Sequence, residues 1–154
     1  MKVLIASLAC ACAASPALAA QPEPKAFAAV WAQEEKYWAS SDTGDFDSYI
    51  KLFDERFTGW PCTAVAPTTK ASMSPSTGGI APPGIKRQVI LDKKAATGVE
   101  DFVVVYYRAK TTGTDASGKA EILIRDFTHT WAASPAGWRI IGGMCRFENP
   151  ALDK

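Results

Sequence analysis

The chain has 154 residues, of which 47% are hydrophobic and 21% charged, a composition typical of one globular domain. Its 17 lysines and arginines nearly balance 16 acidic residues, so the formal net charge is +1. This weak charge and the lack of a basic run argue against nucleic acid or an anionic membrane surface as a partner.

Residues 1–19 have the features of a signal peptide: a positively charged start, a short apolar run and an A-x-A site ending at Ala19. Cleavage after Ala19 leaves 20–154 as one domain and predicts a periplasmic or secreted protein with no membrane insertion. A membrane anchor is the weaker alternative, because a spanning helix needs about 20 apolar residues. Lipidation at Cys10 or Cys12 is also weaker, since neither has a large aliphatic residue three positions before it.

Cleavage would leave two cysteines, Cys62 and Cys145. In an exported protein they either form a disulfide, worth about 3 to 4 kcal/mol, or are buried as two free thiols, and the sequence leaves both possibilities open. One histidine and two distant cysteines do not form a cluster of metal ligands, so we expect no metal and no other cofactor.

Helical spacing begins near Pro24, with large apolar residues at steps of three and four: Phe27, Val30, Trp31, Tyr37 and Trp38. Glu34 falls within this stripe, so we expect its carboxylate on the buried face, either as an ion-paired residue or in a catalytic role. Gly44 and Asp45 predict the end of this helix and the start of a second, whose apolar face runs from Phe46 to Phe53.

The amino-acid composition changes at residues 62–84, which are rich in proline, glycine, serine and threonine. This composition predicts an irregular segment, either a surface loop or a lid. Four segments rich in β-branched and aromatic residues follow, at 88–95, 101–110, 121–132 and 138–147. Helices followed by antiparallel strands indicate an α+β fold, in which the sheet buries one face on the helices.

Several linked motifs resemble the nuclear transport factor 2-like (NTF2-like) superfamily: Tyr37-Trp38, Gly44-Asp45, 57–61 (FTGWP), 128–131 (THTW) and 137–144 (GWRIIGGM). The resemblance is greatest to SnoaL-like and DUF4440-type bacterial proteins. It implies a cystatin-like, cone-shaped fold with helices packed on a curved antiparallel sheet, an apolar pocket and a homodimer. Family members usually have a third helix where this chain has the irregular segment 62–84.

Alignment with ketosteroid isomerase, a distant relative in that superfamily, places the oxyanion-hole tyrosine at Tyr37 and the aspartate base at Pro61, which cannot accept a proton. The second oxyanion donor falls on the strand face of Phe127 and His129. His129 is a candidate base or hydrogen-bond donor near neutral pH, and Glu34 is the carboxylate expected to orient it. The competing interpretation is that Tyr37 and His129 only satisfy backbone groups.

On the strand 121–132, alternate residues share a face, and the alignment directs that face into the pocket. We therefore expect ligand-binding roles for Arg125, Phe127 and Trp131, together with Trp60. The remaining tryptophans are expected to pack between helix and sheet. If the apolar side chains of Val103, Val105 and Tyr107 were exposed, they would fit a dimer contact.

These features favour an exported protein that binds a small apolar molecule without chemistry. The alternative is a cofactor-free isomerase, dehydratase or cyclase that acts on a hydrophobic carbonyl compound through Tyr37, His129 and Glu34. A filled interior would instead indicate a structural dimerisation module.

Overall fold

The computed structural model describes residues 24–77, 79–82, 85, 87–114 and 117–148. The expected signal peptide, including Cys10, Cys12 and the Ala19 cleavage site, lies outside these residues. None of the helices in the described ranges is both long and apolar enough to cross a membrane.

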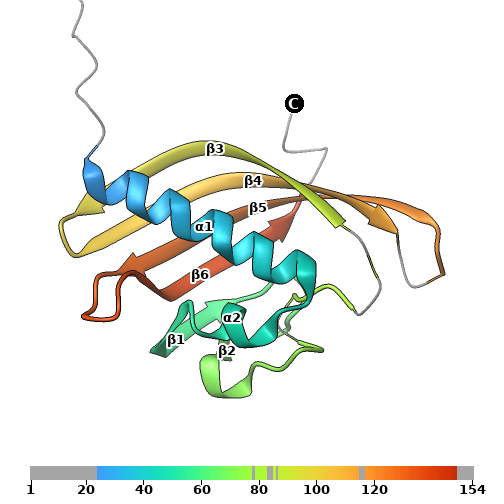
Figure 1. The fold of residues 1–154 in the computed structure, drawn as a ribbon, viewed down its shortest axis with the longest axis horizontal. Helices are drawn as coiled ribbons and strands as arrows, with labels where there is room; N and C mark the ends of the chain where they lie inside the picture. The colour runs from blue at the N-terminus through green and yellow to red at the C-terminus, as the bar shows by residue number, and fades with distance from the viewer. Residues whose placement is uncertain (1–23, 78, 83–84, 86, 115–116, 149–154) are drawn as a thin grey trace, which may run out of the picture.

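The described chain contains two α-helices, one short 3-10 helix and six strands (Figure 1). In chain order they are α1 (Lys25–Thr43), α2 (Phe46–Ile50), β1 (Phe53–Trp60), β2 (Thr68–Thr69), η1 (Lys70–Ser72), β3 (Arg87–Val99), β4 (Phe102–Thr114), β5 (Ala120–Ala132) and β6 (Arg139–Phe147).

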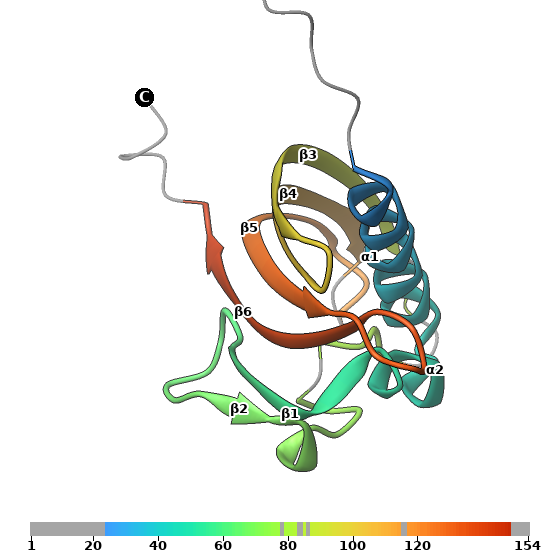
Figure 2. The same ribbon diagram turned by 90° about the vertical axis from the view of Figure 1, so that its left-hand side faces the viewer.

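The strands form one six-stranded sheet in the order β2-β1-β6-β5-β4-β3. Figure 2 shows the long strands curling around the interior, with α1 on the open side of the curve. Register shifts between β3 and β4, between β5 and β6 and between β1 and β6 accompany this curvature, as bulges do in other sheets. The α+β, cone-like architecture expected from the sequence is confirmed.

The first helix matches the expected stripe. Its buried residues follow helical spacing: Val30, Trp31, Glu34, Tyr37, Trp38 and Ser41. The helix begins directly after Pro24 and ends at Thr43. It is followed by Gly44, whose φ of 76° lies in the left-handed region that glycine enters without strain. The buried stripe faces the concave side of the sheet, where alternate β4 residues from Val103 to Ala109 are also buried.

Two expectations for the first half of the chain need correction. The second helix ends at Ile50, and Phe53, expected on its face, begins β1 instead. The backbone N–H of Ile140 donates to the carbonyl of Leu52 at 2.8 Å, so pairing with β6 takes over from the helix at this point. Because β1 runs parallel to β6, the sheet is mixed rather than purely antiparallel.

The irregular segment after β1 is tied to the rest of the domain. Ser41 Oγ donates to the carbonyl of Gly79 at 2.8 Å, and the N–H of Ala81 donates to the carbonyl of Ser41 at 2.8 Å. Lys70 Nζ donates to the carbonyl of Phe53, also at 2.8 Å. Apart from β2 and η1, the described part of 62–84 has no regular structure, in agreement with the sequence. Ile80 and Ala81 are nevertheless buried.

A disulfide joins Cys62, just after β1, to Cys145 on β6, with their Cα atoms 4.8 Å apart. The two residues are 83 positions apart in the sequence. Of the two thiol states left open by the sequence, the structure therefore has the bonded one.

We expect the double substitution Cys62→Ser and Cys145→Ser to lower the free energy of unfolding by about 4 kcal/mol, because the bond closes a long loop in the unfolded chain. Chemical denaturation of the oxidised protein and of the double variant measures this difference. Adding reductant should destabilise the parent protein and leave the variant unchanged. Equal denaturation midpoints for parent and variant would contradict the prediction.

Candidate functional site

A buried carboxylate lies at the centre of the interface between α1 and the sheet. Glu34 has no exposed surface and accepts three hydrogen bonds. Trp131 Nε1 donates to Oε1 at 2.6 Å, and the Tyr107 hydroxyl donates to Oε2 at 2.9 Å. His129 Nδ1 lies 2.9 Å from Oε1 and 3.1 Å from Oε2. These donors supply the hydrogen bonds that a buried carboxylate needs in place of water.

The same contact orients His129, which is 7% exposed. Because a carboxylate only accepts, its hydrogen bond to Nδ1 places the imidazole proton on Nδ1 in the neutral ring. The other nitrogen, Nε2, then carries a lone pair and has no hydrogen-bond partner among the residues described. Gly143 permits this arrangement, since a Cβ there would lie 2.7 Å from His129 Cδ2 and 2.6 Å from the carbonyl oxygen of Thr128.

A second polar pair lies beside the imidazole. The Tyr49 hydroxyl donates to the Tyr37 hydroxyl at 3.1 Å, and the Tyr37 ring packs against His129 with their centroids 5.0 Å apart. Burial raises the pKa of Tyr37 to about 12, so its hydroxyl stays protonated at physiological pH. Within the described chain no acceptor receives the Tyr37 proton, which leaves this hydroxyl able to donate to a ligand.

The interior of the cone is hollow. Tyr37 and His129 both line a cavity of about 210 Å³. Aromatic side chains from α1, α2, β1, β5 and β6 form a large part of its wall, among them Trp38, Tyr49, Phe53, Phe57, Trp60 and Phe127. The irregular segment after β1 completes the wall with Thr63, Thr68, Met73, Thr77, Gly79 and Ile80. This segment therefore forms the part of the wall for which the family resemblance predicts a third helix.

The structure brings together most of the residues singled out from the sequence. Trp60, Arg125 and Phe127 line the cavity, as does Pro61, the position aligned with the missing base.

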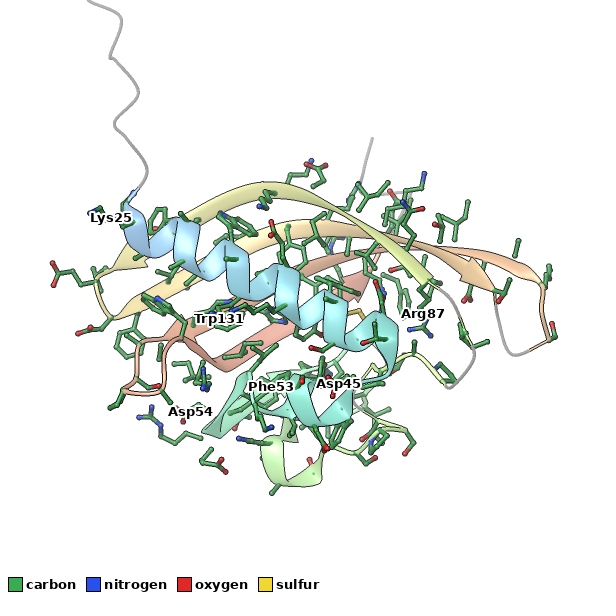
Figure 3. All side chains as sticks on the ribbon, in the orientation of Figure 1. Lys25, Asp45, Phe53, Asp54, Arg87 and Trp131 are labelled. Carbon is green, nitrogen blue, oxygen red and sulfur yellow. A yellow bond between two sulfur atoms is a disulfide. The ribbon has the colours of Figure 1, made fainter. Side chains whose placement is uncertain are left out.

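Trp131 does not line the cavity. Trp131 is fully buried behind the cavity wall, where its indole N–H is bound to Glu34, and Figure 3 shows it beneath α1. The expectation that Trp131 contacts a ligand is therefore corrected: the ring supports the site from behind.

Sequence reasoning missed two polar members of the cavity. Tyr49 lies within the apolar helix face expected from Phe46 to Phe53, and helical spacing does not predict that its hydroxyl donates to Tyr37. Arg87 begins β3 and lines the cavity, and Figure 3 shows it near the C-terminal end of α1. No motif marks Arg87, because only the fold brings the start of β3 to this place. Among the described side chains, no three His, Cys, Asp or Glu residues gather as metal ligands.

Comparison by sequence gives no match to a family model and none to a curated protein. Comparison by structure gives many. An NTF2-like protein of unknown function in nutrient uptake from Rhodospirillum rubrum superimposes with a TM-score of 0.63 at 26% identity. The match covers 78% of this chain and 98% of that one.

Two further structural matches are an isomerase-like protein and an association domain. A ketosteroid isomerase-like protein from Erwinia carotovora atroseptica has a TM-score of 0.68 at 14% identity, covering 82% of this chain and 98% of its own. The association domain of CaMKII from C. elegans has a TM-score of 0.62 at 15% identity, covering 76% and 92%. The chain thus has the NTF2-like, cystatin-like fold that its motifs predicted, and its structural neighbours are NTF2-like and ketosteroid isomerase-like proteins.

Proposed function

We propose that this protein is an exported, SnoaL-like or DUF4440-type member of the NTF2-like superfamily that binds a small organic molecule in the cavity of its cone. The hollow interior carries the proposal, because an aromatic cavity with a few convergent polar groups is the usual form of a ligand site. Unused hydrogen-bonding capacity at Tyr37 and His129 would orient the bound molecule.

Two features of the chain support export. The first 19 residues read as a cleavable signal peptide. The disulfide between Cys62 and Cys145 is of the kind that persists in oxidising compartments such as the periplasm.

A homodimer through the outer face of the sheet belongs to the same proposal. Large apolar side chains are exposed on that face, among them Ile90, Phe102, Tyr106 and Ile122. Val103, Val105 and Tyr107, considered as dimer residues from the sequence, point the other way and are buried under α1. The contact is therefore expected at the alternate residues of β4.

Filling the cavity tests the binding function. Leu123 lines the cavity, whereas its neighbour Ile122 is 62% exposed on the opposite face of β5. We expect native mass spectrometry of the protein purified from its own compartment to detect a bound small molecule. Leu123→Trp should lose this molecule by steric exclusion, and the matched control Ile122→Trp should keep it. A protein without any bound molecule, or one whose ligand remains in Leu123→Trp, would count against the proposal.

A second candidate function is cofactor-free isomerisation or elimination on a carbonyl compound, favoured by the contact between Glu34 and His129. The bare Nε2 would take a proton next to the carbonyl, and the Tyr37 hydroxyl would donate to the oxygen as charge develops on it. His129 would then act as the base in place of the aspartate, because proline occupies the aligned position, Pro61.

This candidate is tested with 3-cyclohexenone, a single-ring ketone whose double bond moves into conjugation when a proton is transferred. If the chemistry is present, the ultraviolet absorbance of the conjugated product grows faster with the protein than without it. His129→Gln should lower the rate by about 100-fold or more. Glu34→Gln should lower it less, since the ring remains but loses its orienting carboxylate. No acceleration by the parent protein, or full activity in His129→Gln, would exclude His129 as the base for this reaction.

A further inference from the structure

Two arginines face the cavity without an ion pair to a carboxylate among the described residues. Arg87 at the start of β3 and Arg125 on β5 both line it. Neither forms an ion pair with a carboxylate of the residues described. Arg125 donates one hydrogen bond, from Nη2 to Thr111 Oγ1 at 2.9 Å, and Arg87 has no side-chain hydrogen bond in the same part of the chain.

Arg125 is held in place by aromatic rings rather than by charge. Its guanidinium carbon lies 5.3 Å from the centre of the Trp38 ring and 5.5 Å from that of Phe127. Its Nε is buried without a hydrogen-bond partner. Burial lowers the pKa of this guanidinium, and the positive charge of Arg87 acts in the same direction. A partly buried cation without an ion pair is costly, and an anion that met it would reduce this cost.

The nearby acidic residues offset this charge only in part. Asp42 on α1 is close enough to feel both arginines, yet it makes no ion pair with either, and its Oδ1 is itself buried without a partner. Burial raises the pKa of Asp42 against the opposing effect of the two arginines. Glu34 is committed to Trp131, Tyr107 and His129 behind the wall. The cavity therefore presents excess positive charge to a ligand.

The cavity volume limits the size of that ligand. A dry cavity of about 150 Å³ holds one benzene molecule. The volume here, about 210 Å³, leaves room for one six-membered ring and a substituent. Aromatic walls at Phe53, Phe57 and Phe127 suit the flat faces of such a ring.

We propose that the cavity binds a single-ring organic carboxylate, with its carboxylate at Arg125 and Arg87, its ring among the aromatic walls and its far side toward Tyr37 and His129. Guanidinium groups bind carboxylates through charge-assisted, often bidentate hydrogen bonds. This inference rests on the proposed ligand-binding function, and it replaces the purely apolar ligand expected from the sequence with an anionic one.

The test compares benzoate with benzamide, two molecules of nearly the same size that differ in charge. Isothermal titration calorimetry of the purified full protein should give at least ten-fold tighter binding of benzoate, equivalent to about 1.4 kcal/mol. Raising the salt concentration should weaken benzoate binding more than benzamide binding. Equal affinities would overturn the carboxylate assignment and leave the ligand-binding function standing.

Three substitutions locate the effect. Arg125→Gln should remove the preference for benzoate, while Arg125→Lys, which retains a charge, should keep part of it. Arg56→Gln is the matched control, because Arg56 lies outside the cavity wall, pairs with Asp54, and its side chain is 77% exposed. If Arg125→Gln does not fold, as melting curves would show, Arg87→Gln replaces it and should weaken benzoate binding by at least three-fold.

Two further outcomes would overturn the inference. One is an unchanged benzoate preference in both Arg125→Gln and Arg87→Gln. The other is the absence of saturable benzoate binding by the parent protein. The ligand-binding function is judged separately, by the molecule that co-purifies with the protein and by its loss from Leu123→Trp.

Discussion

The hydrogen bonds to the Glu34 carboxylate are the constraint on which the site depends. A carboxylate without solvent contact is tolerated only when donors replace the water that it has lost. Here the donors come from two strands: Tyr107 lies on β4, and His129 and Trp131 lie on β5. The one side chain thus fastens α1 to the middle of the sheet and sets the orientation of the imidazole. A mutation that removed the carboxylate would disturb packing and chemistry together.

A ligand site also requires an open cavity, and the wall of this cavity depends on the irregular segment after β1. Residues of this segment, among them Thr63, Thr77 and Ile80, line the cavity beside the helices and the sheet. The disulfide fixes the start of the segment to β6, and the hydrogen bonds of Ser41 fix its end to α1. A proline- and glycine-rich sequence therefore forms one wall of the site without forming a helix. The wall supplies threonine hydroxyls as well as apolar surface.

Much of this arrangement could be predicted from periodicity and motifs. Helical spacing places Glu34 on the buried face of α1, and the alternation of β5 places Arg125, Phe127 and His129 on one face. The orientation of β4 could not be predicted, because apolar residues occupy both of its faces from Phe102 to Tyr107. Neither could the cavity position of Arg87, nor the burial of Trp131 behind the wall, since these depend on how distant strands meet.

The sequence contains one histidine, so the position of the proton on its ring reports directly on the contact between Glu34 and His129. Nitrogen-15 NMR of the folded, ligand-free protein at neutral pH distinguishes a protonated ring nitrogen from a bare one. For the neutral ring we expect a proton fixed on Nδ1, next to Glu34, and an unprotonated Nε2. A neutral ring with its proton on Nε2, or a neutral ring that exchanges freely between its two tautomers as in water, would show that Glu34 does not hold His129.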